Sequence, residues 1–323
     1  MLVEPAGFEP SDLVGALQTL WGIEVRDLEY VPVGFGSHHW RVTGRDLRRW
    51  FVNVDEAGTA GALDRLHRAL GTAAALSESG LEFVHAPVRN VAGACVAPLG
   101  GFAVSVTSYV DGVSYEYGDF PDPHLRRAVL VAVGRLHAAA SRVAVGLTTR
   151  DDLAVAGRGE FFAALAADGR WRAGPYGEAA RELVVAALPR IETMFGRYDH
   201  LARAVASTAE RWVVTHGEPH PGNVMSTDHG ILLIDWETAL VAPRERDLWR
   251  LIPSDDDEWP APDRDDRLAY GRDADLDSSA LALYRLRWDL ADICAFTGAL
   301  RAPHDDDEDA RLAITCLRGY LAA

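Results

Sequence analysis

Two periodicities divide the chain into a strand-rich first third and a mostly helical remainder. Short segments rich in β-branched and aromatic residues, separated by Gly- and Asp-containing turns, predict strands at 28–34, 38–44, 48–55, 93–99 and 101–110. Apolar residues at helical spacing predict helices at 11–21, 58–77, 123–143, 159–168, 178–205, 280–300 and 308–322. Ser11 or Asp12 is expected to cap the first of these helices.

This order of elements predicts an α+β fold with two lobes. The first lobe, residues 1–110, would be a small antiparallel sheet with one inserted helix. The second lobe, residues 111–323, would be mostly helical, with a strand-like hairpin at 212–240. Gly, Tyr, Asp and Pro are concentrated at 111–123, which favours a boundary there. A length of 323 residues is also typical of two domains.

The chain is strongly acidic and contains no lysine. Its 48 Asp and Glu residues outnumber 32 basic residues, all of them Arg, which gives a formal net charge of −16. Such a surface disfavours nucleic acid and anionic lipid and attracts cations. The absence of lysine excludes Schiff-base and pyridoxal-phosphate chemistry and Walker-type phosphate loops, because each of these needs a lysine amine.

Features of export or membrane insertion are missing from the sequence. No run of about 18 apolar residues occurs, and the N-terminal residues MLVEPAGFEP do not resemble a secretory signal. Cys95, Cys294 and Cys316 lie far apart and suggest neither a disulfide framework nor a metal site. We therefore expect a cytoplasmic monomer or weak homodimer without nucleic-acid or membrane partners.

Acidic residues form three runs in the second half of the chain, at 255–259, 263–266 and 305–309. We interpret the first two as one loop and the third as the start of a helix. Acidic runs usually form a solvated surface, and a binding site for a cationic molecule is the alternative.

The residues most typical of catalysis lie in VVTHGEPHPGNVM (213–225) and GILLIDWE (230–237). Glu218 precedes Asn223 by five residues, and Asp235 ends the returning strand. Mg²⁺ prefers hard oxygen ligands, and one carboxylate and one amide suffice when substrate phosphates supply the rest. These residues could therefore hold a hydroxyl nucleophile and one or two Mg²⁺ ions over the phosphates of a nucleotide.

The pattern HGEPHPGN…LLIDWE resembles the catalytic hairpin of the aminoglycoside phosphotransferase / choline kinase family, a branch of the protein-kinase-like fold. GRLHA (134–138) and ERDLW (245–249) are similar to other segments of that family, the second especially to its spectinomycin-phosphotransferase-like members. The resemblance is specific within 213–249 and weaker elsewhere.

The resemblance implies a role for each residue of the hairpin. Glu218 takes the position of the catalytic base, and Asn223 and Asp235 become Mg²⁺ ligands. His216 would orient the loop against the metal-binding residues. The alternative for His216 is a loop histidine whose ring is satisfied by backbone carbonyls.

The resemblance also implies that ATP or GTP binds under the first lobe. Gly34 and Gly36 would belong to a loop over the phosphates, with Ser37 as a hydrogen-bond donor, and an ordinary turn is the alternative. The hinge that receives the base would fall near Thr107–Val110. The histidines outside the hairpin are interpreted as structural or surface residues: His38, His39, His67, His85 and His124.

The chain departs from the family pattern in two places. The lysine that contacts the α and β phosphates corresponds to Asn53, and the following helix has Arg65 and Arg68 where an acidic partner is expected. One of these arginines, Arg68 for example, could reach the phosphates instead. Glu218 replaces the usual Asp, which would displace the carboxylate by about one methylene and indicates a shifted acceptor or a slow enzyme.

Together these observations predict an Mg²⁺-dependent kinase that moves the γ-phosphate of ATP or GTP to a hydroxyl of a small, cationic, aminoglycoside- or aminocyclitol-like molecule. Such an activity would confer antibiotic resistance. Asp289, Asp292 and Asp257 are candidates for the acceptor site. Two alternatives stay open: a catalytically inactive binding module, favoured by Asn53 and Glu218, and a kinase acting on Ser or Thr of a peptide.

Overall fold

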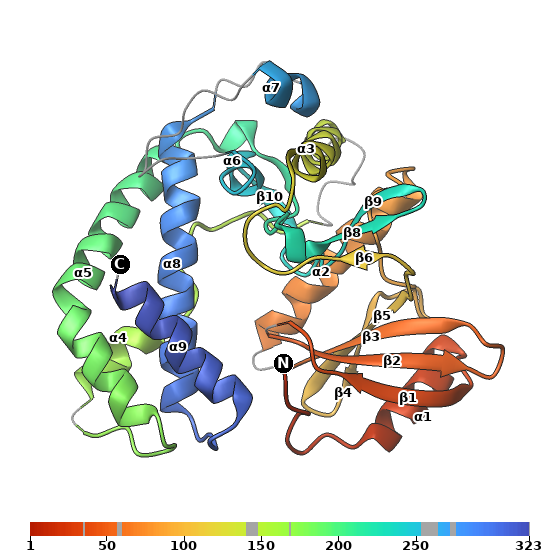
Figure 1. Cartoon of the computed structure of the whole chain (residues 1–323), viewed down its shortest axis with the longest axis horizontal. Coiled ribbons are helices and arrows are strands. Elements are labelled where there is room, and N and C mark those ends of the chain that lie inside the picture. The colour runs from red at the N-terminus through yellow and green to blue at the C-terminus, as the bar shows by residue number, and fades with distance from the viewer. Residues whose placement is uncertain are drawn as a thin grey trace. The chain divides into compact units, whose positions relative to one another are not determined.

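The computed structural model describes residues 1–34, 36–56, 60–139, 148–167, 169–252, 264–271 and 276–322 (Figure 1). The chain forms two compact units. The first comprises Met1–Asp151 and Arg211–Asp275, and the second comprises Asp152–Glu210 and Leu276–Ala323. Among the described residues, no helix combines the length and apolarity needed to cross a membrane. The division into lobes at residue 110 stays a prediction.

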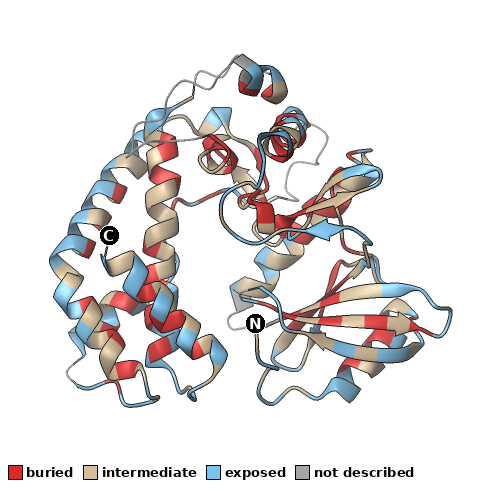
Figure 2. Cartoon of the chain, viewed as in Figure 1, coloured by how far each residue is buried: buried red, intermediate tan, exposed pale blue. Residues whose placement is uncertain are grey.

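A five-stranded antiparallel sheet begins the first unit, with strand order β1-β2-β3-β5-β4. Its strands are β1 (Val25–Val31), β2 (His38–Gly44), β3 (Arg49–Glu56), β4 (Val96–Leu99) and β5 (Phe102–Ser108). Buried and half-buried residues alternate strictly along β2, as expected when one face of a sheet packs on a core (Figure 2). The five predicted strands are therefore confirmed.

Helix α1 (Pro10–Trp21) supplies the apolar layer against this sheet. Leu13 and Leu17 are completely buried and cluster with Trp40 and Val52 of the sheet. The predicted capping by Ser11 or Asp12 is wrong, because the helix begins at Pro10 and its N-cap, Glu9, makes no side-chain cap bond. Proline at the first position has a fixed φ suited to the helix and no N–H that needs a partner.

The predicted hairpin at 212–240 forms two small sheets in the first unit. Strand β7 (Val213–Thr215) pairs with β10 (Leu240–Ala242), and β8 (Val224–Thr227) lies between β9 (Gly230–Leu233) and a short strand that the pattern did not predict, β6 (Val113–Ser114). The segment after helix α2 (Ala60–Glu78) joins the other edge of β9, where Leu233 N–H donates to Phe83 O at 2.7 Å. Strand β9 is thus held on both sides immediately before Asp235.

Three helices complete the first unit: α3 (Pro123–Ala138), α6 (Glu245–Leu248) and α7 (Arg264–Tyr270). Gly134 of α3 is required for close packing against α7, because a Cβ there would overlap the backbone carbonyl of Tyr270. Placing residues 264–266 of the second acidic run in a loop was wrong, since α7 begins at Arg264. The rest of that predicted loop, including the acidic residues 255–259, lies outside the described residues. The carboxylate of Asp266 is buried and pairs with Arg126 at 2.8 Å. The guanidinium of Arg126 compensates the buried charge, and this partner lies far away in sequence.

The second unit is helical, as the apolar spacing predicted. It contains α4 (Arg158–Ala166), α5 (Gly177–Ala206), α8 (Ser278–Arg301) and α9 (Glu308–Ala322). Helix α8 packs against both α5 and α9 around completely buried side chains such as Ile191 and Leu290 (Figures 1 and 2). The third acidic run lies at the start of α9, as expected. There the Asp307 carboxylate caps the helix by accepting a hydrogen bond from the Ala310 N–H at 2.8 Å.

Candidate active site

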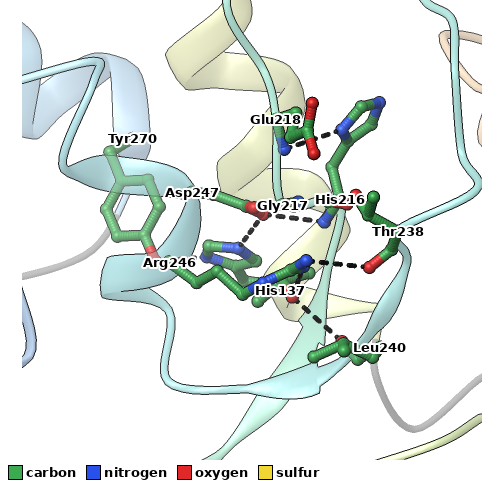
Figure 3. A network of polar contacts seen from close by, with 10 residues as sticks. His137, His216, Gly217, Glu218, Thr238, Leu240, Arg246, Asp247 and Tyr270 are labelled. Carbon is green, nitrogen blue, oxygen red and sulfur yellow. Dashed lines mark hydrogen bonds and ion pairs between the residues drawn. The ribbon is translucent and has the colours of Figure 1, made fainter. Parts of the chain in front are cut away.

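The loop between β7 and β8, residues 216–223, carries most of the predicted catalytic residues. Asp247 of α6 holds the start of this loop. Its two carboxylate oxygens accept hydrogen bonds from the backbone N–H groups of His216, at 3.0 Å, and Gly217, at 2.5 Å (Figure 3). Asp247 also contacts His137 Nε2 of α3 at 2.9 Å, and the Tyr270 hydroxyl lies 2.7 Å from the other nitrogen of that ring.

These bonds determine the charge of Asp247, which is completely buried. Burial alone would raise the pKa of this carboxyl group. The hydrogen bond from His137 and the positive charge of Arg246 outweigh burial and hold the pKa below its usual value. Asp247 is therefore ionised near neutral pH, when it can accept all three hydrogen bonds.

Gly217 is required at its position for two reasons. Its φ of +104° lies in the left-handed region that favours glycine, and a Cβ would overlap the guanidinium of Arg246. That guanidinium donates to Thr215 Oγ1 and to the carbonyl of Thr238, both at 2.9 Å (Figure 3). Arg246 thus fills the space beside Gly217 and connects the catalytic loop to the segment after β9.

His216 connects the two halves of the hairpin. Its Nδ1 accepts a hydrogen bond from the Glu218 N–H at 3.2 Å, so its Nε2–H donates to the carbonyl of Ile234 at 2.9 Å. The ring is completely buried, with Trp236 edge-on at 4.6 Å. Burial lowers the pKa of His216, which keeps the ring neutral as these two bonds require. These contacts agree with both interpretations of His216. Backbone groups satisfy the hydrogen bonds of its ring, as expected for a loop histidine. The ring also links Glu218 to the residue before Asp235, as expected for an orienting residue.

Asn223 ends the loop in a short 3₁₀ turn, Pro221–Asn223. Its side-chain nitrogen donates to the carbonyl of Glu218 at 3.1 Å, which turns the amide oxygen toward other ligands. His220 lies beside both residues, with its Nε2 3.9 Å from the Glu218 carboxylate. Burial, with the nearby charge of Arg250, lowers the pKa of His220 to about 3, so that this ring is neutral near pH 7.

Asp235 has an unusual backbone conformation. Its φ of +61° places a non-glycine residue in the left-handed region, which costs on the order of 1–3 kcal/mol and persists mainly at functional sites. Solvent reaches the residue, yet the surrounding protein desolvates its carboxylate and raises the pKa, while the nearby His216 opposes this shift. A recessed carboxylate that solvent can still reach suits a metal ligand.

Two further carboxylates, Asp55 and Glu237, interact electrostatically with Asp235. We call these three residues the acidic cluster. The Asn53 side-chain nitrogen donates to Glu237 Oε1 at 3.1 Å, and the Ser37 hydroxyl donates to Asp55 and lies 3.4 Å from Glu237 Oε2. Burial raises the pKa of Asp55 to about 6, with a contribution from Asp235. Burial and the other two carboxylates raise the pKa of Glu237 well above its usual value.

The sequence pattern did not identify Asp55 and Glu237 as site residues. Asp55 follows the predicted site residue Asn53 by two positions, and Glu237 follows the predicted site residue Asp235 by two positions. In a strand this spacing returns side chains to the same face, so Asp55 could have been found from its place in β3. His39 was interpreted as structural, and its Nδ1 lies 3.2 Å from the Asn53 side-chain oxygen.

The remaining predicted nucleotide-binding residues belong to three places in the first unit. Gly34 and Gly36 lie in the turn between β1 and β2 with φ values of +72° and +87°, which favour glycine. Thr107 is the last but one residue of β5, where its hydroxyl donates to the Phe51 carbonyl at 3.3 Å, and Val110 is half-buried just after the strand. Arg65 and Arg68 are exposed on α2. Their proposed contact with phosphates stays a prediction.

The predicted acceptor residues belong to the second unit or lie outside the described residues. Asp289 and Asp292 are half-buried on α8, and Asp292 accepts a hydrogen bond from the Tyr320 hydroxyl of α9 at 2.6 Å. Asp257 lies outside the described residues. The role of all three stays a prediction.

The donor set in the hairpin suits magnesium. Asp235, Asn223 and the acidic cluster offer oxygen atoms, and one oxygen of Asp55, Oδ2, is buried without a hydrogen-bond partner. No group of three or more His, Cys, Asp or Glu side chains in the described part of the chain has the geometry of a complete metal site. A metal ion here would therefore need further ligands from a substrate.

Comparison with solved structures supports the kinase-like fold. Spectinomycin phosphotransferase APH(9)-Ia, in complex with ADP and spectinomycin, has a TM-score of 0.70 at 14% identity, covering 96% of this chain and 93% of that one. Amicoumacin kinase hAmiN, in complex with AMP-PNP and Ca²⁺, has a TM-score of 0.64 at 13% identity, with 97% and 93% covered. Choline kinase LicA from Streptococcus pneumoniae has a TM-score of 0.56 at 13% identity, with 97% and 98% covered.

Sequence comparison identifies the family. Protein StrN from Streptomyces griseus is 30% identical over 311 residues, which cover 88% of this chain and 83% of StrN. The sequence model described as "Phosphotransferase enzyme family" matches residues 27–284, which include most of the five-stranded sheet, the catalytic loop and the acidic cluster. The predicted kinase-like fold and the predicted resemblance are therefore confirmed, and the chain belongs to the phosphotransferase enzyme family.

Proposed function

We propose that this protein transfers the γ-phosphate of ATP or GTP to a hydroxyl group of a small, amine-bearing molecule of the aminoglycoside or aminocyclitol type. The observation that carries the proposal is the catalytic hairpin. Hydrogen bonds hold Glu218 and Asn223 in the loop, and His216 bonds to the carbonyl of the residue before Asp235. Membership of the phosphotransferase family supports the reaction type. Relatives in complex with ADP and AMP-PNP support a nucleotide as the phosphate donor.

Asp235 and the side-chain oxygen of Asn223 would hold Mg²⁺. When bound, this ion would shield the negative charge of the phosphate during transfer. Glu218 accepts the proton of the acceptor hydroxyl and positions its oxygen for attack. His216 and Asp247 act indirectly, because they fix the backbone on which Glu218 lies. This positioning matters, since a displacement of about 1 Å can lower the rate about 100-fold.

The acidity of the chain supports a cationic acceptor. The net charge of −16 favours encounter with amines, and Asp289, Asp292 and Asp257 are the acidic side chains that we propose for acceptor binding. A complex of a structural relative with spectinomycin agrees with an acceptor of this class. Neutralising Asp289 by substitution with Asn should raise the KM for the acceptor more than the KM for the nucleotide.

The test is phosphate transfer from ATP or GTP with labelled γ-phosphate to a panel of amine-bearing acceptors, with and without Mg²⁺. Labelled product is expected with at least one acceptor and is expected to fall at least 100-fold in Glu218→Gln. Asp292→Asn should instead weaken acceptor binding and leave the nucleotide KM unchanged. Transfer that Glu218→Gln leaves unchanged would contradict the proposed role of Glu218.

A binding module without turnover is the second candidate function. The observation that favours it is Asn53, which occupies the position of the family lysine and donates to Glu237 instead of carrying a positive charge. Nucleotide binding without phosphate transfer to any acceptor would favour this module. Transfer to Ser or Thr of a peptide, and to no small molecule, would favour the third reaction considered above.

A further inference from the structure

Tyr117 is a large aromatic side chain that the proposed mechanism does not use. It follows strand β6 and is 55% exposed to solvent. A single exposed aromatic residue is ordinary on a protein surface and needs no explanation. Tyr117 differs from such a residue in two respects, because other side chains hold its ring in place and because it lies beside the catalytic loop.

Arg250 fixes the orientation of the Tyr117 ring. The Nη1 atom of Arg250 donates to the Tyr117 hydroxyl at 2.9 Å, and the central carbon of the guanidinium lies over the ring, 4.6 Å from its centroid. The same guanidinium lies 5.0 Å from the centroid of the Trp249 ring. A cation therefore covers one face of Tyr117, and a hydrogen bond and a cation–π contact together hold the ring.

A single residue, His220, lies between Tyr117 and the proposed catalytic base. The rings of Tyr117 and His220 meet edge-on with their centroids 5.0 Å apart, and His220 Nε2 lies 3.9 Å from the Glu218 carboxylate. The backbone approaches the loop as well, because a Cβ on Gly222 would lie 3.5 Å from the Tyr117 nitrogen. All four residues belong to the first unit. An acceptor whose hydroxyl reaches Glu218 would therefore extend past the Tyr117 ring.

We propose that Tyr117 binds the acceptor, and that its ring packs against the uncharged carbon face of the sugar or cyclitol ring that carries the reacting hydroxyl. This inference rests on the proposed function. A ring that is already held in place loses little conformational entropy on binding, so its apolar contact contributes to affinity. The positive charge of Arg250 on one face disfavours an ammonium group on the other face, so the amines of the acceptor would lie elsewhere.

The rival explanation is that Tyr117 only supports the catalytic loop. Tyr117 would then hold the His220 ring, and His220 would help to position Glu218. The two explanations predict different kinetic effects. Loss of a contact with the acceptor raises the KM for the acceptor and leaves kcat unchanged, whereas displacement of the base lowers kcat and leaves the acceptor KM unchanged.

The test is the steady-state kinetics of Tyr117 variants with Mg–ATP and the panel of amine-bearing acceptors, spectinomycin included. Tyr117→Ala should raise the acceptor KM at least about tenfold, with kcat and the ATP KM unchanged, because an aromatic contact is lost. Tyr117→Phe keeps the ring, so its acceptor KM should stay within about threefold of the natural value. Tyr117→Leu should lie between these two, because contact with a carbon face needs an apolar surface and no π system.

Tyr176→Ala is the matched control. Tyr176 also packs against a histidine, with its ring 6.1 Å from that of His304, and its hydroxyl also bonds to a charged side chain, Asp306, at 2.5 Å. It belongs to the second unit and immediately precedes α5. This substitution should leave the acceptor KM unchanged. Thermal unfolding of each variant without ligand shows whether it is folded before its kinetics are compared.

An acceptor KM that Tyr117→Ala leaves unchanged would overturn the inference, whether or not kcat falls. An equal rise in Tyr117→Phe and Tyr117→Ala would overturn it as well, because the contact would then belong to the hydroxyl. An equal rise in Tyr117→Leu and Tyr117→Ala would overturn the assignment of an uncharged face. All three results leave the proposed function intact. Failure of the natural protein to phosphorylate any acceptor would instead contradict the proposed function, and this inference with it.

Discussion

Gly217 in the catalytic loop is constrained both by its backbone conformation and by its packing against a neighbouring side chain. Its positive φ and its contact with Arg246 both exclude a Cβ. Gly217→Ala should destabilise the protein by about 2–4 kcal/mol, because the backbone strain adds to the displacement of a half-buried guanidinium that donates two hydrogen bonds. Urea unfolding measures this change.

Gly230 provides the control for Gly217. It also has a positive φ, of +119°, but a Cβ there would meet no atom within 4 Å. Gly230→Ala should therefore show only the backbone effect, about 1–2 kcal/mol. Equal destabilisation by the two substitutions would show that the contact with Arg246 contributes nothing.

His39 predicts a dependence of stability on pH. Burial lowers its pKa from 6.5 to about 4, so between these values the unfolded chain binds a proton that the folded protein does not. The contribution of His39 to the free energy of unfolding is therefore complete above about pH 6.5 and decreases as the pH falls, by roughly 2–3 kcal/mol at pH 4.

The measurement for His39 is urea unfolding at pH 7 and pH 4.5. His39→Gln keeps a donor for Asn53 but does not titrate, so the loss of stability between the two pH values should be smaller than in the natural protein. His124→Gln, which replaces an exposed histidine at the start of α3, should leave that loss unchanged. The same loss in all three proteins would contradict the assignment.

At the level of residues, the sequence predicted the site residues that lie in one continuous segment. It missed the site residues that come together from separate segments. Glu218, Asn223 and Asp235 lie in one short hairpin, so their spacing identifies them. Asp55 and Glu237 come together because β3 and the segment after β9 approach one another, and no local pattern reports that contact.

At the level of elements, helix α6 determines the position of the catalytic loop through Asp247. Asp247→Asn keeps the shape of the side chain but replaces one acceptor oxygen by a donor, which would face a backbone N–H. We expect a loss of about 3 kcal/mol in the free energy of unfolding, as when one partner of a buried charged pair is removed. We also expect kcat to fall more than either KM.

Asp277 provides a matched control for this substitution. It also accepts hydrogen bonds from two backbone N–H groups, those of Ser279 and Ala280, but at the start of α8. Because Asn is an equally good N-cap, Asp277→Asn should change stability by no more than about 0.5 kcal/mol. If Asp247→Asn behaves like Asp277→Asn, the buried network does not hold the loop in the way described.

Long elements were predicted well because their apolar period repeats over many residues. The helices of the second unit match their predicted ranges closely, as α9 does at 308–322. Among the elements that were missed, β6 and α7 are short and depend on distant partners. Strand β6 pairs with β8, and α7 is stabilised by the ion pair between Asp266 and Arg126.

At the scale of the whole molecule, the net charge of −16 should influence the binding of a cationic acceptor. Raising the ionic strength from roughly 0.05 M to 0.5 M shortens the screening length about threefold. The KM for an amine-bearing acceptor should therefore rise several-fold, whereas the KM for the anionic nucleotide should not rise in parallel. Steady-state kinetics in NaCl measure both values. An acceptor KM that is independent of salt would contradict electrostatic attraction.

The central claim is that Asp235 and its neighbours bind a nucleotide through a metal ion. It is tested most directly by calorimetric titration of the protein with ATP, and then with GTP, in the presence and absence of Mg²⁺. We expect binding in the micromolar to low-millimolar range, dependent on Mg²⁺ and lost in Asp235→Asn. Absence of binding by either nucleotide, or equal binding by the Asp235→Asn variant, would contradict the account.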